Sequence, residues 1–150
     1  MTSTDRAARF AAVYALLRSA ADVADHWVQT DHQASAKGQH DHTDGQSSAA
    51  GRRACAAHVA AYTATQGAVL LAGARLLGVR LRPGPVTAAL ALSAVTHYVA
   101  DRREPLRRLA DATGKGNFVR LADHGMNGAY ALDQAWHHAA ETIAALIASA

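Results

Sequence analysis

The chain has 150 residues, which is enough for one domain with a single hydrophobic core. Half of the residues are hydrophobic, but 38 are alanine and only 5% are aromatic, so close helix packing is favoured and a strand-rich fold is excluded. The net charge of +3 suits an anionic partner without requiring one, and the single cysteine, Cys55, excludes an internal disulfide or a multi-cysteine zinc site. We therefore predict an all-α protein.

The first predicted helix covers about residues 4–37, with Thr4 as its N-cap. Its apolar side is expected to gather Phe10, Val13, Leu17, Ala24 and Val28. The polar segment that follows, GQHDHTDGQSSAAG (about residues 38–51), is flanked by glycines and is predicted to be a mobile loop.

Three further long helices are predicted. The second covers about residues 52–77, and the third covers about residues 86–103, after the helix-breaking sequence RPGPV. A short basic helix, PLRRLADATG, lies within a basic connector at about residues 102–128, and the fourth long helix covers about residues 129–147. The prediction is one helical domain, 1–150, built as a four-helix bundle with a short extra helix between helices three and four.

Histidines and aspartates lie where these helices should be apolar. At about 100° per residue, His97 falls on the stripe of Val86, Leu90 and Ala94, and Asp101 lies about 40° away. Two other groups follow the same rule: His58 in line with Thr65, Val69 and Leu76, and Asp133 with His137 in line with Ala140, Ala144 and Ile147. These polar side chains are therefore expected to point into the bundle.

Buried charged groups need a partner or a metal ion, and several carboxylates in one core repel each other unless a cation lies between them. Helical bundles commonly hold such ions through side chains on facing helices, and imidazole with carboxylate suits zinc, manganese or iron. We predict His58, His97 and His137 as metal ligands, with Asp101 and Asp133 as further ligands or as the catalytic base. The alternative is a buried hydrogen-bond network that only holds the helices in register.

Four stretches, VADHWVQTDHQASAKG, RRACAAHVAAYT, VTHYVADRREPLRRLADATGKGNF and YALDQAWHH, resemble the bacterial domain-of-unknown-function family 3307, usually described as predicted membrane proteins. In that family the first helix carries His, Asp and Gln at four-residue steps and then Lys, the second carries His, the third His-x-x-x-Asp, and the last Asp-Gln-x-x-His. The resemblance implies these matching positions: Asp25, Gln29, Lys37, His58, His97, Asp101, Asp133, Gln134 and His137.

The resemblance adds Asp25 to the predicted metal ligands, and Gln29 and Lys37 to the predicted substrate contacts. Ala21 stands where the family pattern expects its first histidine. If Asp25 is a ligand, the space beside it is therefore expected to be open to water or substrate.

The longest apolar stretches, GAVLLAGA and GPVTAALALSAVT, are shorter than the roughly 18 residues that a membrane span needs. The sequence MTSTDRAARF also lacks the apolar region of a secretory signal. We expect a soluble, cytoplasmic protein without stable membrane insertion.

Arginines follow the predicted site residues closely in sequence: Arg52, Arg53, Arg102, Arg103, Arg107 and Arg108. If the helices alternate in direction, the first four of these would ring the mouth of the metal site and grip an anionic substrate, since guanidinium binds phosphate or carboxylate in bidentate fashion. The alternative is an ordinary solvated basic loop.

Other candidates are weaker. The loop QHDHTDG, with His40, Asp41, His42 and Asp44, could bind a metal ion. The sequence ATGKGN lacks the upstream glycine and the Ser or Thr of a phosphate-binding loop. Cys55 is expected to be a small buried residue, and three histidines are expected to face solvent: His26, His32 and His138.

The predicted function is a metal-dependent hydrolase that acts on a phosphate-bearing or otherwise anionic small substrate, with zinc, manganese or iron as cofactor. One alternative is a non-enzymatic helical regulator that binds nucleic acid through its arginine stretch and uses the His/Asp cluster structurally. Another is a metal sensor or store that turns over no substrate.

Overall fold

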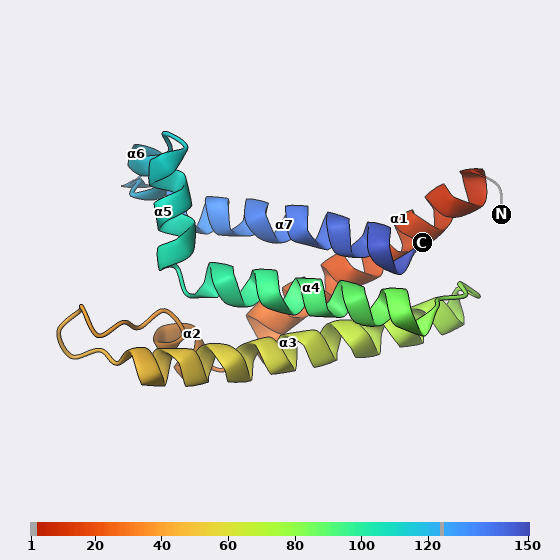
Figure 1. Ribbon diagram of the computed structural model, residues 1–150, viewed down its shortest axis with the longest axis horizontal. Helices are drawn as coiled ribbons and strands as arrows, with labels where there is room; N and C mark the ends of the chain where they lie inside the picture. Colours follow the sequence, from red (N-terminus) through yellow and green to blue (C-terminus); the bar gives the residue numbers. More distant parts are fainter. Residues whose placement is uncertain (1–2, 124) are drawn as a thin grey trace.

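A computed structural model describes residues 3–123 and 125–150. Four long helices form most of it: α1 (Ser3–Val23), α3 (Ser48–Leu76), α4 (Pro83–Asp101) and α7 (Gly128–Ala148). They run in alternating directions along the long axis (Figure 1), and α1 and α4 each pack against both α3 and α7. The fold is therefore all-α, as predicted, and no helix of the described ranges has the length and apolar character needed to cross a membrane.

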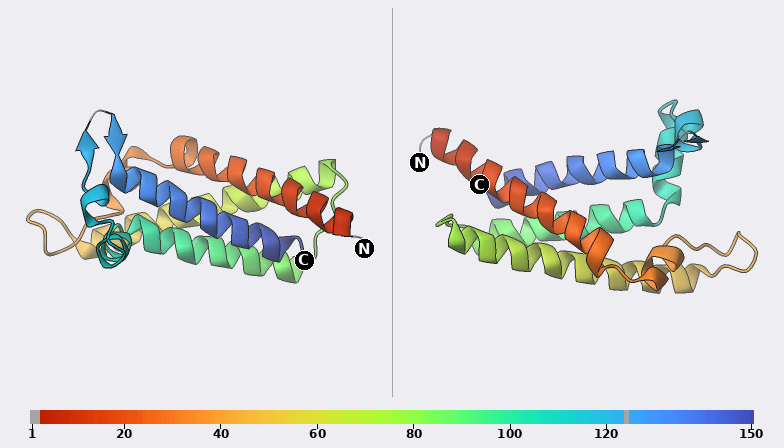
Figure 2. Two further views of the ribbon diagram at one scale, coloured as in Figure 1. Left: turned by 90° about the horizontal axis from the view of Figure 1, so that it is seen from above. Right: turned by 180° about the vertical axis from the view of Figure 1, so that it is seen from behind.

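The remaining elements are short: η1 (Ala24–Val28), α2 (Asp31–Ala36), α5 (Glu104–Ala112), α6 (Gly116–Val119), β1 (Ala122–Asp123) and β2 (Met126–Asn127). All of them lie toward the end of the molecule opposite the chain termini (Figures 1 and 2). The short helix α5 confirms the predicted extra helix. The stretch after it, which was expected to be irregular, contains α6 and the two-stranded hairpin, and its His124 lies outside the described residues.

Local signals set the ends of the long helices. Ser47 caps α3, accepting a hydrogen bond from the backbone N–H of Ala50, so the helix begins four residues before the predicted start. Pro83 opens α4 at the first helical turn, where proline loses no backbone hydrogen bond, so the breaker sequence belongs partly to the helix. Asn127 caps α7 by accepting from the N–H of Tyr130.

The first predicted helix is not continuous, which corrects the sequence prediction. After α1 the chain makes one π-helical turn, extends at Gln29 and restarts as α2. Thr30 begins α2 with a capping box, in which Gln33 N donates to Thr30 Oγ1 (3.2 Å) and Thr30 N donates to Gln33 Oε1 (3.0 Å). The interruption turns Val28, predicted to be on the apolar side, to the surface with 41% exposure.

The apolar core lies between the four long helices, toward the end where α1 begins and α7 ends (Figure 1). Its fully buried members include Val13, Leu17, Leu70, Ala89 and Ala145. On α3 the buried line steps by about one turn through residues 58, 62, 66, 70 and 74, whereas Leu76, which the predicted stripe placed inside, is exposed. The predicted stripe advances by seven, four and seven residues, whereas the buried line advances by four residues each time, so the two separate along the helix.

Candidate metal centre

Four side chains converge where α4 ends: Asp25 of η1, His58 of α3, and His97 and Asp101 of α4. We call them the four-residue cluster. The Nε2 atoms of His58 and His97 are 2.9 Å apart. Asp25 Oδ1 lies 3.1 Å and 3.4 Å from these two nitrogens, and Asp101 Oδ2 lies 3.3 Å and 3.2 Å from them. Ligands about 2.0–2.1 Å from a tetrahedral ion are separated by about 3.3 Å, so each of these five distances is close to that between two ligands of one ion.

Asp25 belongs to this cluster and is the second residue of the π-helical turn. Counted along a regular α-helix, Asp25 falls only at the edge of the apolar side. In the structure the backbone N–H of Gln29 donates to Ala24 O (2.9 Å), five residues back, so the turn contains one extra residue. The Asp25 side chain is 16% exposed, and its Oδ1 lies within 3.4 Å of the Nε2 atoms of both histidines.

Hydrogen bonding alone does not satisfy these atoms well. Each N–H of an imidazole lies in the ring plane and serves one acceptor, whether the ring is neutral or protonated. Protons on both facing nitrogens would oppose each other at 2.9 Å, whereas a single proton would leave the other nitrogen lone pair directed at the carboxylates. Asp101 Oδ2 is also buried without a hydrogen-bond partner among the described residues. A cation between the four atoms would remove all of these conflicts.

The charges in the cluster are strongly coupled. Burial disfavours the charged form of His97, but the nearby carboxylates of Asp101 and Asp25 outweigh it and raise the pKa of His97 to about 9. The pKa of Asp25 is held well below its usual range, because hydrogen bonds from His58 and His97 outweigh burial. Burial also acts on Asp101, yet His97 and Lys37 keep its pKa low. The two carboxylates are therefore ionised at neutral pH and available to a cation.

Aromatic packing, rather than hydrogen bonds at Nδ1, supports the buried imidazoles. The ring of His97 lies between Tyr62, with centroids 3.8 Å apart, and His137, with centroids 4.3 Å apart. Nδ1 of His58 and Nδ1 of His97 are buried without a partner in the described part of the chain. Metal-binding histidines usually donate this second N–H to a carbonyl or carboxylate, so the support of the rings by aromatic contacts departs from the common pattern.

The other two predicted ligands, Asp133 and His137, lie beside the four-residue cluster. His137 Nε2 is 3.4 Å from Asp133 Oδ2, which also accepts from Gln134 Nε2 at 3.5 Å. One ligand atom each from Asp101, Asp133 and His137 lie within 4.8 Å of one another, and so do atoms from Asp25, His97 and His137. All six predicted ligands therefore gather in one region.

Of the two residues predicted by the resemblance to contact substrate, Lys37 contacts the four-residue cluster. Lys37 Nζ lies 2.8 Å from Asp101 Oδ1, whereas the other oxygen of this carboxylate, Oδ2, faces the imidazoles of His58 and His97. Gln29 Nε2 is buried without a hydrogen-bond partner among the described residues. In this structure Lys37 neutralises a cluster carboxylate, a role that the sequence pattern did not predict.

Four arginines were predicted to ring the site, and none contacts the four-residue cluster through the interactions found in the described residues. Arg52 and Arg53 are exposed on α3. Arg102 is 7% exposed and donates to the carbonyl oxygens of Lys37 and Gln39, while Arg103 donates to Ala34 O at 3.2 Å. Arg102 and Arg103 therefore fasten the segment that carries Lys37.

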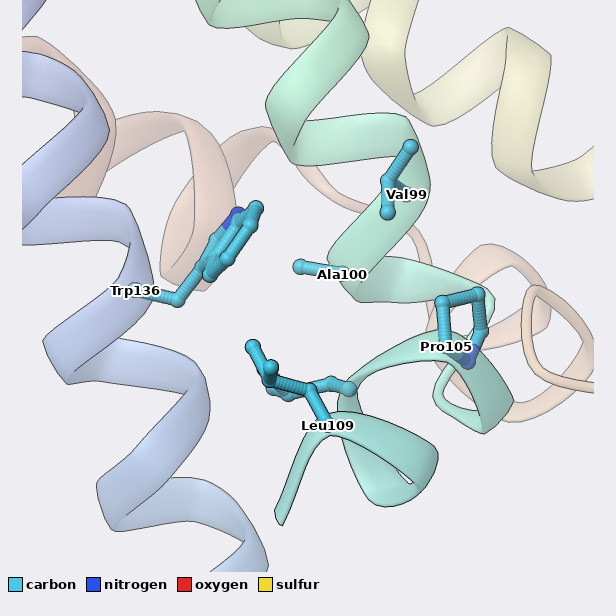
Figure 3. A pocket seen from close by; sticks show the side chains of 6 residues that line it. Val99, Ala100, Pro105, Leu109 and Trp136 are labelled. Carbon is cyan, nitrogen blue, oxygen red and sulfur yellow. The ribbon is translucent and has the colours of Figure 1, made fainter. Parts of the chain in front are cut away.

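Two hollows lie near these arginines. One, with a volume of about 410 Å³, is lined mainly by His40, Arg52, Tyr98, Arg102, Glu104 and Arg108. The other is an apolar notch of about 40 Å³, where Trp136 faces Leu109, Pro105, Val99 and Ala100 (Figure 3). The notch seats α5 against α4 and α7, whereas the larger hollow has the basic lining that an anion would require.

The loop histidines form a separate group at the surface. One ligand atom each of His40, His42 and Glu104 lie within 4.8 Å of one another, and the two imidazole rings stack with centroids 5.1 Å apart. His40 is already engaged, since its Nε2 lies 3.0 Å from Arg102 O. Asp41 instead exchanges hydrogen bonds with Ser48 and anchors the loop to α3.

Sequence reasoning missed a buried polar layer next to the cluster. Glu141 accepts from Arg18 at 2.7 Å and 2.9 Å and from the hydroxyl of Tyr62 at 3.1 Å, while Gln66 donates to that hydroxyl and accepts from Ser93. Burial raises the pKa values of Tyr62 and Glu141. The signal was present, because Tyr62, Glu141 and Ser93 lie one helical turn from His58, His137 and His97 respectively.

The position of Ala21 contradicts one expectation. The space beside it was expected to be open, but Ala21 is fully buried and packs with Ala24 and Tyr62. The Tyr62 ring therefore occupies the neighbourhood where the family pattern would place an imidazole. Cys55 is buried, as expected, and burial raises the pKa of its thiol to about 12; the three histidines predicted to face solvent are exposed.

Comparison of the chain with protein-family models, with curated proteins and with solved structures finds no match. The resemblance to family 3307 therefore stays a prediction, and the geometry of the His/Asp residues carries the functional argument.

Proposed function

We propose that the chain is a four-helix bundle with a metal centre at one end, and that it is a metal-dependent hydrolase of phosphate-bearing or otherwise anionic substrates. We keep the relationship to family 3307 as part of this proposal. The observation that carries it is that the Nε2 atoms of His58 and His97 are 2.9 Å apart, and that one oxygen each of Asp25 and Asp101 lies 3.1–3.4 Å from both nitrogens. Zinc, manganese and iron all accept this donor set.

The residues in and around the cluster would have different roles. His58, His97, Asp25 and Asp101 would hold the ion, and Lys37 would fix the orientation of Asp101 through its other oxygen. A bound divalent ion supplies a water of lowered pKa and polarises the scissile bond. Asp25 and Asp133 are the more exposed carboxylates, with 16% and 27% of their side chains accessible, so substrate would approach between them.

Charge favours an anionic substrate. Asp25, Asp101 and Asp133 carry three negative charges, and Lys37 with one divalent ion would neutralise them. The centre would then not repel an anion, although the carboxylates alone would. The basic hollow lined by Arg52, Arg102 and Arg108 offers a further place for the rest of a larger anionic substrate.

The test uses full-length protein purified without a polyhistidine tag and then assayed with p-nitrophenyl phosphate, bis-p-nitrophenyl phosphate and uncharged p-nitrophenyl acetate. We expect hydrolysis of a phosphate ester that depends on added zinc, manganese or ferrous ion. His97→Ala should abolish both metal binding and turnover, whereas His138→Ala, which alters an exposed neighbouring histidine, should change neither. Absence of bound metal in the unaltered protein would overturn the proposal.

Burial of the cluster gives one alternative some support. His58, His97 and Asp101 are at most 4% exposed, which also suits a metal sensor or store that admits no substrate. Tight metal binding without turnover of any ester would favour that function. The nucleic-acid regulator predicts a different result, because binding through exposed Arg107 and Arg108 should weaken steeply with salt and should not depend on metal.

A further inference from the structure

Asp133 and His137 are not accounted for by an ion in the four-residue cluster. We propose that they hold a second divalent ion, so that the centre contains two ions bridged by carboxylate. This inference rests on the proposed metal centre and deepens it, because it chooses the role of ligand for Asp133 over that of catalytic base.

The orientation of the two rings separates the positions of the two ions. An imidazole binds an ion in the plane of its ring, at about 2.0–2.1 Å for zinc. The rings of His97 and His137 are stacked, with centroids 4.3 Å apart and planes inclined by only 28°. Planes stacked in this way stay apart near the rings, so one ion cannot lie in both at bonding distance.

His58 provides the contrast. Its ring is inclined by 54° to that of His97, and the two Nε2 atoms approach to 2.9 Å. These two histidines can therefore share one ion, whereas His137 must direct its nitrogen to another position. That position is marked by Asp133 Oδ2, which lies 3.4 Å from His137 Nε2.

The two positions are linked by shared ligands. Ligand atoms of Asp101, Asp133 and His137 lie within 4.8 Å of one another, and Asp101 is also a member of the four-residue cluster. Asp25 forms a similar group with His97 and His137. Lys37 takes the Oδ1 atom of Asp101, so Asp25 is the carboxylate with a second oxygen left to bridge two ions, which in two-metal hydrolases are about 3.5–4 Å apart. The stacking distance of the two rings is close to this separation.

Charge defines the substrate class of a centre with two ions. A single divalent ion with Lys37 would neutralise three carboxylates, and a second ion would make the centre cationic. A cationic centre binds anionic esters and stabilises the charge that develops on both the attacking and leaving oxygens. Its substrate class is therefore a phosphate mono- or diester rather than an uncharged ester.

The experiment measures bound Mn²⁺ by equilibrium dialysis and its EPR spectrum. His42→Ala serves as the parent for every variant, because His40, His42 and Glu104 could bind an ion at the surface. We expect two ions per chain and the spectrum of a spin-coupled pair. Asp133→Asn and His137→Gln should each bind one ion, with the spectrum of isolated Mn²⁺, while His138→Ala should keep the pair.

Three outcomes would overturn the inference. If the parent binds one ion and Asp133→Asn leaves it unchanged, the second site does not exist, but the proposed metal centre survives. If Asp133→Asn loses all metal while its circular dichroism keeps the helical signal, Asp133 is a ligand of a single ion. If the parent binds no ion, the proposed function itself fails.

Discussion

The two ends of the helix assembly are built from the same four helices but are filled differently. Toward the chain termini, Val13, Leu17 and Leu70 are fully buried among other apolar side chains. At the other end, His58 and His97 are buried just as completely, together with carboxylates. The apolar end is stabilised by the removal of surface from water, whereas the polar end is stable only if its charges are matched.

Between the two ends the character changes turn by turn along α3. His58, Tyr62, Gln66 and Leu70 lie at successive four-residue steps, and the polar layer around Glu141 separates the cluster from the apolar core. With such a gradient, the apolar end needs no ligand to be stable, whereas the polar end would need a cation to match its charges. Stability and metal affinity should therefore respond to different substitutions.

The largest expected effect on stability comes from a substitution in the apolar end. Leu70→Ala removes a fully buried side chain and should lower the free energy of unfolding by about 2–5 kcal/mol. Metal affinity should stay within about threefold, because Leu70 lies three helical turns, roughly 18 Å, from His58 along α3. Denaturant unfolding and metal titration would measure both quantities, and a parallel loss of affinity would show that the two ends are coupled.

The next effect tests the boundary between the cluster and the polar layer. Ala21→His introduces the histidine of the family pattern into a site where Tyr62 already packs, and such overpacking should cost about 1–3 kcal/mol. In a Tyr62→Ala background the cost should shrink, since the imidazole would enter the vacated space. Thermal unfolding of the two single variants and the double variant gives the coupling directly. Equal costs in both backgrounds would mean that Tyr62 does not occupy that position.

The third prediction concerns pH. In the metal-free protein the pKa of His97 is raised to about 9, above its unfolded value of about 6.5, so the stability it contributes is complete below about pH 6.5 and is lost as the pH rises through 9. Metal binding requires the neutral ring, so affinity should instead rise up to about tenfold per pH unit between pH 7 and 9.

Opposite slopes for stability and affinity are therefore the signature of His97, and they can be measured by denaturation of metal-free protein and by chelator-buffered titration. His97→Gln should remove the downward slope of stability. On the acidic side, the lowered pKa of Asp25 contributes stability above about pH 4 that is lost as the pH falls.

Much of this arrangement could be predicted from the sequence. The all-α fold follows from alanine content, and the inward direction of His58, His97 and His137 follows from their helical phase. Asp25 could not be reached that way, because its phase places it only at the edge of the apolar side, and only the family resemblance pointed to it. Val28 was wrongly placed on the apolar side because a π-helical turn interrupts the helix. Periodicity assumes a regular helix and therefore fails where the backbone departs from one.

The arginines illustrate a second limit. Their closeness in sequence to Asp101 suggested a ring around the cluster, but Arg102 and Arg103 follow the end of α4, and Arg103 has a φ of 61°. The chain turns there, and both guanidinium groups meet backbone carbonyls of the segment before the loop. Tertiary contacts between segments more than sixty residues apart are not encoded in any local spacing.

The smallest expected effect on stability concerns the N-terminal cap of α2. Thr30→Ala removes one half of the capping box and should cost about 1 kcal/mol, whereas Thr30→Ser keeps the hydroxyl and should cost less. Helix α2 leads to Lys37, whose ammonium group touches Asp101, so the substitution tests whether the cap contributes to the centre or only to stability. We expect metal affinity to stay within about threefold, because Arg102 and Arg103 hold the Lys37 segment independently. A tenfold change in affinity for the alanine variant, absent from the serine variant, would instead make the start of α2 part of the metal centre.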